Sequence, residues 1–176
     1  MHEGILLLRL LLGLVLLVHA AQKSLGWFQG LGLTTMAGAF EQLGLRPGKP
    51  MVLLASITEA LAAVSLLLGL FTPLGAAAAA GTMAVAGATS QLSAGSFWNA
   101  KKGGEYPYVL AVLGIVLAFT GAGAWSLDAL LTTAYPQAAP FLGGTAVGLA
   151  VVVLAGLSAA VFLKVVLNRR PAGQPT

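Results

Sequence analysis

Residues 51–70 read MVLLASITEALAAVSLLLGL, and this run indicates the class of fold more clearly than any other part of the chain. A run of about 20 apolar residues is long enough to cross a bilayer as a helix. Its one ionisable residue, Glu59, stands near the middle, where inserting a charge costs about 3 kcal/mol or more. Such a residue persists only where it faces protein or water, and it is then a functional candidate. The stretch therefore predicts a membrane helix with one carboxyl inside a protein bundle.

The composition extends this prediction to the whole chain. The 176 residues are 58% hydrophobic and 8% charged, with a mean hydropathy of +0.92, whereas soluble domains are about 25% charged. Basic residues lie at the ends of apolar runs, so the net charge of +4 reflects membrane topology and nucleic acid is not an expected partner. The absence of cysteine excludes iron–sulfur clusters and thiolate metal sites. With a single intramembrane histidine, neither haem nor another metal centre is expected.

Five apolar runs are predicted to be helices, because backbone groups in lipid must be hydrogen-bonded internally. They cover about residues 5–24, 51–70, 73–92, 107–124 and 141–167, and a polar tail covers 168–176. The short junction at 71–73 requires the second and third runs to form a tight antiparallel hairpin. Small residues around Glu59 favour close helix packing. The expected fold is an all-α membrane protein, a four-helix transmembrane bundle plus an additional C-terminal transmembrane helix.

The basic residues also predict an orientation. Five crossings place all of them except Arg9 on one side, which the positive-inside rule makes cytoplasmic. The chain is thus expected in the cell (inner) membrane, with its N-terminus outside and its C-terminus in the cytoplasm. A cleaved signal peptide is the alternative for the first run, although its start, MHEG, lacks the usual positive charge. Residues 25–50 and 95–108 are rich in aromatic residues and are expected to lie at the membrane interface.

Polar side chains from separate runs are predicted to meet in the inner half of the membrane. Glu59 lies about 12 Å and His19 about 7 Å from the cytoplasmic ends of their runs, at 1.5 Å per residue. A carboxyl in an apolar interior can hold or pass a proton near neutral pH, and so can an imidazole. Glu59 and His19 are therefore the candidate proton-handling pair. The candidate ligand-binding residues are Lys23, Gln22, Trp27, Asn99 and Glu105.

Each of these residues also has a purely structural interpretation. The polar cluster would then fix helix register through hydrogen bonds, and Lys23 would extend from its helix end toward the headgroups. Trp27 would belong to an aromatic belt rather than to the wall of a site for a flat ligand such as a quinone. On the opposite side, Arg9 and Asp128 are predicted to form a structural ion pair, with Arg9 reaching outward to water as the alternative.

Several spaced motifs resemble the DoxX family between about residues 6 and 131. They are HAAQKSLGWFQGLGL from His19, FEQLGL from Phe40, LLLGLFTPLGA from Leu66, GSFWNAKKGGEYPYVL from Gly95 and TGAGAWSLDALL from Thr120. The resemblance implies a four-helix membrane bundle, and the family takes its name from a subunit of a quinone-linked oxidoreductase that acts on thiosulfate. The family's polar positions match His19, Gln22, Lys23, Glu59, Asn99, Glu105 and Asp128. Ala20, Ala62 and Ala63 stand where the family often has glycine, and the fifth span is an addition that could dock a partner.

The sequence leaves three functions open. The first is a quinone-interacting subunit of a membrane oxidoreductase system, whose electron donor sits on a soluble or membrane-bound redox partner. The alternative is a non-enzymatic scaffold that anchors redox or stress-response enzymes at the bilayer, and the third is a small proton-coupled transporter. Whether the chain is itself an enzyme stays open, as does assembly into a homo-oligomer.

Overall fold

The computed structural model describes residues 2–167, and within them every regular element is a helix. The predicted polar tail, 168–176, lies outside the described residues. The elements are α1 (His2–Ser24), α2 (Gly32–Gln42), α3 (Gly48–Leu68), α4 (Thr72–Ala94), η1 (Asn99–Lys101), α5 (Glu105–Thr120), α6 (Leu127–Ala134), η2 (Pro136–Ala138), α7 (Ala139–Leu142) and α8 (Thr145–Leu167).

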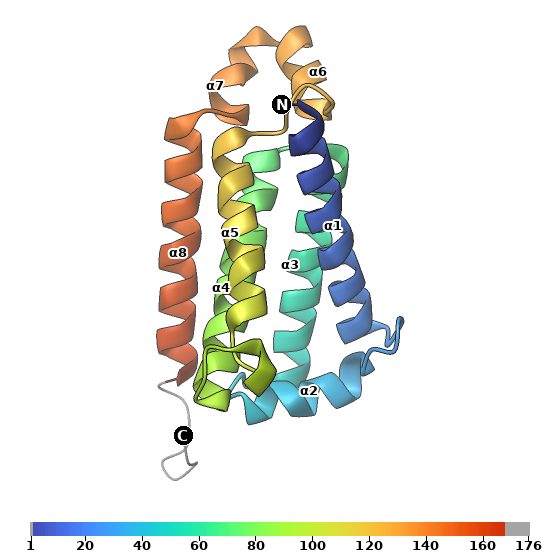
Figure 1. Cartoon of the computed structure of the whole chain (residues 1–176), viewed down its shortest axis with the longest axis vertical. Coiled ribbons are helices and arrows are strands. Elements are labelled where there is room, and N and C mark those ends of the chain that lie inside the picture. The colour runs from blue at the N-terminus through green and yellow to red at the C-terminus, as the bar shows by residue number, and fades with distance from the viewer. Residues whose placement is uncertain (1, 168–176) are drawn as a thin grey trace.

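Five long helices run side by side along the molecule. α1, α3, α4 and α5 form the bundle, and α8 packs along α4 and α5 (Figure 1). α2 lies across the lower end, whereas α6 and α7 cover the upper end together with the N-terminus. The predicted all-α membrane architecture, with four helices and an added C-terminal helix, is confirmed. The segment expected at the interface is α2, which joins α1 to α3.

Not every bundle helix is recognisable as a span by length and composition. Three are long and apolar enough to cross a membrane, namely His2–Ser24, Gly48–Leu68 and Thr145–Val166. α4 is equally long but rich in Ala and Gly, and it is the central helix, packed against α3, α5 and α8. A helix surrounded by protein needs close contact more than hydrophobicity. α5 is apolar but has 16 residues, about 24 Å of helix.

The hairpin between α3 and α4 forms as predicted, with a glycine at the turn. Gly69 adopts a left-handed conformation after α3, with its N–H and that of Leu70 bonded to carbonyls of the last helical turn. α4 then starts at Thr72 with Pro73 in its first turn, where the missing proline N–H does no harm.

Two predicted spans differ from the helices at one end. The run 107–124 stops being helical at Thr120, because Gly121 takes a backbone conformation that ends α5. The run 141–167 is interrupted by Gly143 and Gly144, so that the long helix α8 begins only at Thr145. The residues between these two spans contain the short helix α6, capped by the Ser126 hydroxyl, which accepts the Ala129 N–H at 3.1 Å.

The bundle core is closely packed through small residues. Gly13 of α1 faces α3 so closely that an added Cβ would lie 2.9 Å from Leu67 Cγ. Gly114 of α5 likewise approaches α4, where a Cβ would lie 2.9 Å from the Ala76 carbonyl oxygen. Ala62 and Ala63, which lie one helical turn after Glu59, are fully buried. The predicted small-residue packing around Glu59 is confirmed, and it fixes the position of that carboxyl.

Candidate functional site

Glu59 sits at the middle of α3 with its side chain turned into the protein. Only 1% of it is exposed. One carboxylate oxygen, Oε1, accepts a hydrogen bond from Lys23 Nζ in a direct ion pair. The other oxygen, Oε2, is buried and has no hydrogen-bond partner. A buried carboxylate oxygen without a partner has lost its water and gained no hydrogen bond in return, so it is a candidate contact for a ligand.

Lys23 approaches Glu59 from the last turn of α1. Its side chain is 18% exposed, so the ammonium points inward while part of the side chain still contacts the outside. The tendency of a lysine at a helix end is to extend toward the headgroups. Here the buried carboxylate provides a stronger attraction, and the C-terminal end of α1 favours a cation nearby. The Lys23–Glu59 pair therefore joins α1 to α3 in the lower half of the bundle.

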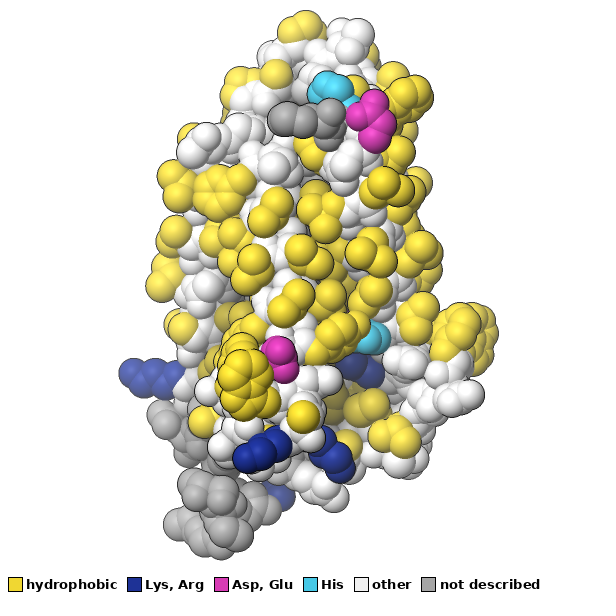
Figure 2. Space-filling model, viewed as in Figure 1, with side chains coloured by type: hydrophobic (Ala, Val, Ile, Leu, Met, Phe, Trp, Pro, Cys, Tyr) yellow, Lys and Arg dark blue, Asp and Glu magenta, His cyan; other side chains and the backbone are white. Residues whose placement is uncertain are grey.

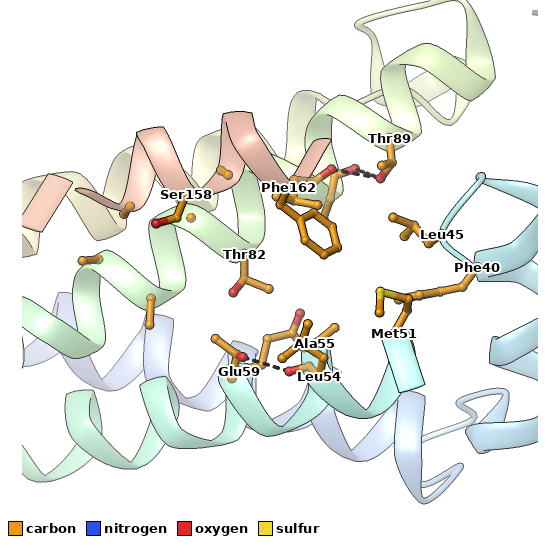
Figure 3. Close-up of a pocket in the computed structure, with 18 of the residues that line it drawn as sticks. Phe40, Leu45, Met51, Leu54, Ala55, Glu59, Thr82, Thr89, Ser158 and Phe162 are labelled. Atoms are coloured by element: carbon orange, nitrogen blue, oxygen red, sulfur yellow. Dashed lines mark hydrogen bonds between the residues drawn. The ribbon is translucent and has the colours of Figure 1, made fainter. Parts of the chain in front are cut away.

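Glu59 and Lys23 line a cavity of about 620 Å³ between α3, α4 and α8. Figure 3 shows the Glu59 side chain directed from α3 into this space, with Thr82 of α4 and Phe162 of α8 on the opposite side. Phe40 and Leu45, from α2 and the loop after it, close the lower end. Most of the wall is aliphatic. The cavity thus has an apolar body and a single charged pair.

The cavity communicates with the side of the bundle. Leu54 of α3 and Leu154 of α8 both line it, yet they are 51% and 63% exposed. α8 packs on α4 and α5 but has no extensive contact with α3. The gap between α3 and α8 therefore faces the surroundings of the bundle, which for a membrane helix are lipid chains.

His19 is not brought to Glu59. Its imidazole lies against the ring of Tyr106 on α5, with ring centroids 5.8 Å apart in an edge-on arrangement. No hydrogen bond joins it to Glu59 in the described part of the chain, and it does not line the cavity. The expected shared niche of carboxyl and imidazole is therefore not what the structure shows: Lys23 occupies the position next to the carboxyl.

The other predicted ligand-binding residues shape the connecting segments. Gln22 Nε2 donates to the Phe28 carbonyl at 3.1 Å, which holds the turn after α1. Trp27 is 60% exposed and packs edge-on against Phe28. Glu105 Oε2 accepts the backbone N–H of Asn99 at 2.9 Å, which fixes the loop before α5. None of these residues lines the cavity of Glu59.

Arg9 and Asp128 are both buried at the upper end, but each bonds backbone groups. Arg9 donates to the carbonyls of Ala122 and Trp125, the latter at 2.7 Å. Asp128 accepts the N–H groups of Phe71 and Thr72 at 2.7 and 2.8 Å, and thereby caps α4. No direct ion pair joins them among residues 2–167, although their charges interact through space. The predicted Arg9–Asp128 interaction is thus indirect, because each side chain uses its hydrogen bonds on backbone groups of a neighbouring turn.

The comparisons with known proteins give one result. No curated protein and no solved structure matches this chain. The DoxX family model matches residues 4–91, half of the chain, from α1 into the last turn of α4. This range includes His19, Lys23 and Glu59, whereas Asn99, Glu105 and the whole of α8 lie beyond it. The chain belongs to the DoxX family.

Proposed function

We propose that this protein is a quinone-interacting subunit of a membrane oxidoreductase system, and that the cavity beside Glu59 binds the quinone ring. One observation carries the proposal: Glu59, a buried carboxylate with one oxygen that lacks a hydrogen-bond partner, is among the residues that line a large and mostly apolar cavity. A volume of about 620 Å³ falls within the usual range of about 300–1,000 Å³ for small-molecule sites, which are mostly apolar with a few placed polar groups.

The charged pair matches the two hydrogen-bonding forms of such a ligand. Lys23 Nζ can only donate, and a quinone carbonyl oxygen can only accept. Glu59 Oε2 accepts, which suits the hydroxyl group of the reduced ring. A quinone supplies two-electron redox chemistry coupled to two protons when it is bound. The residues of this chain bind and orient the ring, exclude water and hold a proton at Glu59 Oε2.

The proton and the electrons are expected to follow different routes. Lys23 is partly exposed at the lower end of the bundle, so the pair connects the cavity with that side of the membrane. The chain has no cysteine and only one histidine within its apolar runs, which leaves few groups able to bind an electron-transfer centre. The electron donor is therefore assigned to a partner protein.

The charge distribution supports an orientation for this arrangement. On the face seen in Figure 2, Lys and Arg side chains gather at the lower end and hydrophobic side chains cover the middle. The buried Arg9 lies at the other end. The positive-inside rule makes the lower end cytoplasmic, with the N-terminus outside, in the inner membrane of the cell. The Lys23 end of α1 then lies on the cytoplasmic side, and we expect the site to exchange protons with that compartment.

Quinone binding by the purified protein tests the proposal. In detergent micelles, the wild type is expected to bind a quinone with a short tail, and Glu59→Gln to bind it about tenfold more weakly or worse. Glu105→Gln is the matched control, because Glu105 lies outside the cavity and glutamine keeps an acceptor for the Asn99 N–H. Equal binding by the wild type and Glu59→Gln, with both folded by circular dichroism, would contradict the proposal. A wild type that binds no quinone would favour the scaffold function instead.

A further inference from the structure

The cavity is longer than a ring requires. Its lining on α4 runs from Leu74 to Ser90, about 24 Å along the helix axis at 1.5 Å per residue. Glu59 contacts only one part of this length. The remainder is mostly aliphatic, with hydroxyl groups of a few threonine and serine residues, and at Leu54 and Leu154 it reaches the outer surface of the bundle. A ligand that fills it has a compact polar end and an extended apolar part.

α8 gives the groove its width, because it presents small side chains toward α4. Ala155 of α8 lies next to Gly81 of α4: a Cβ added to Gly81 would lie 3.6 Å from the Ala155 Cβ, an ordinary van der Waals contact. Ser158 and Ala159 continue the same wall, and Phe162 follows one turn later, toward the lower end. Larger residues at these positions would fill the space. The wall of small residues therefore leaves the groove open along α8.

The route into the groove is sideways. α3 and α8 line the groove from opposite sides without extensive contact with each other. Each contributes an exposed leucine to the lining, Leu54 on α3 and Leu154 on α8. Phe40 and Leu45 line the end of the cavity nearest α2, at the right in Figure 3. In a bilayer the lateral gap opens onto lipid chains, so a molecule dissolved in the membrane reaches Glu59 without crossing a polar surface.

We propose that α8 is a tail-recognition element: the ligand enters from the bilayer between α3 and α8, and its apolar tail lies in the groove against Ser158 and Leu154. This inference rests on the proposed function for the identity of the head group. The tail site itself follows from the length, lining and lateral opening of the groove. It also gives a role to α8, which lies beyond the residues that match the family model.

A pair of substitutions on α8 tests the inference. Ser158→Phe places a ring in the groove. Val153→Phe places the same ring about 140° around the helix from Ser158, on an exposed part of α8 that does not line the cavity. Two probes are compared in detergent micelles: a quinone with a decyl tail, and the same ring with a methyl group in place of the tail. Thermal unfolding of each variant verifies that it is folded.

The expected result is selective. Ser158→Phe should weaken binding of the decyl quinone about tenfold or more and leave the methyl quinone within about twofold, while Val153→Phe changes neither. Equal weakening of both probes would show that the ring, not the tail, lies against α8, and would overturn this inference while leaving the Glu59 site intact. Failure of the wild type to bind either probe would instead remove the proposed function.

A second measurement does not depend on any variant. A decyl quinone carrying a diazirine at the end of its tail is photolysed with the wild-type protein in nanodiscs, and the labelled residues are mapped by mass spectrometry. Labelling is expected on α8 around Leu154 and Ser158 and on α3 at Leu54. Labelling spread over the outer faces of α1 and α5, or a groove filled by co-purified phospholipid that the quinone does not displace, would overturn the inference.

Discussion

Replacing Lys23 by methionine removes the only hydrogen-bond partner that Glu59 has in the described part of the chain. Methionine keeps most of the volume of the lysine stem, so the packing of α1 against α3 changes little. The carboxyl, 1% exposed, is then left either charged without a counter-ion or obliged to take up a proton. The variant therefore isolates the electrostatic contribution of the pair.

The size of the effect follows from which partner is removed. Breaking a buried pair by deleting one charge costs about 3–5 kcal/mol, because the other charge remains uncompensated. Glu59 is fully enclosed, so Lys23→Met is expected near 3 kcal/mol, the lower end, since protonation limits the loss. Lys23 is 18% exposed and can turn outward, so Glu59→Gln should cost about 1–2 kcal/mol. Replacing both, in Lys23→Met/Glu59→Leu, should be neutral or stabilising by up to about 4 kcal/mol.

Thermal unfolding in detergent measures these differences. For a chain of this size, 3 kcal/mol corresponds to a fall in Tm of about 6–12 °C. The expected order is therefore a large fall for Lys23→Met, a smaller one for Glu59→Gln, and recovery in the double variant. A coupling free energy calculated from this cycle verifies that the two residues interact. A Lys23→Met protein whose Tm equals that of the wild type would refute the buried pair.

Three further predictions concern the surroundings of the site. Gly69→Ala should destabilise the fold by at least about 1–2 kcal/mol, because Gly69 has a left-handed backbone conformation and an added Cβ would lie 2.3 Å from Arg9 Nη1. The control is Gly38→Ala: Gly38 lies inside α2 with open space around it, so this variant should stabilise the fold by about 0.5–1 kcal/mol in the same thermal assay. Asp128→Ala should cost about 1–2 kcal/mol by removing the cap of α4, and Asp128→Asn less, because the amide oxygen keeps one acceptor; equal unfolding temperatures would contradict the capping role. His19→Phe should leave quinone affinity within about twofold, because the imidazole does not line the cavity; a loss as large as that of Glu59→Gln would return His19 to the site.

The sequence was sufficient to identify the bundle and the buried carboxyl. Glu59 interrupts an apolar run and is flanked at helical spacing by Ala62, Ala63 and Ser56, all of which are buried. Periodicity and residue size together predict that this face packs on protein. The helix ends were predictable to within a few residues wherever glycine or proline marks them, as at Gly69 and Pro73.

The partner of Glu59 was not predictable in the same way. Depth estimated from the rise per residue placed His19 near it, but rise alone ignores the rotation of α1 and the angle at which it crosses α3. His19 faces Tyr106, and the long side chain of Lys23 reaches Glu59 from the helix end. Side-chain reach of this kind depends on three-dimensional placement, which a single sequence does not give.

The cavity could not be predicted from the sequence of any one helix. It arises because α8 packs on α4 and α5 and leaves α3 uncovered, and because Ala155 and Ser158 are small. Each of these residues looks ordinary in a membrane helix. The short helix α6, by contrast, had a recognisable signal, since Ser126 precedes it as an N-cap.

A crystal structure of the protein with a bound short-tailed quinone would show whether the cavity beside Glu59 is a quinone site. Ring density is expected in the cavity between α3, α4 and α8, with a ring oxygen within hydrogen-bonding distance, about 2.5–3.2 Å, of Glu59 Oε2 or Lys23 Nζ. Ring density elsewhere on the protein, with the Glu59 carboxyl contacting only side chains of this chain, would contradict this expectation.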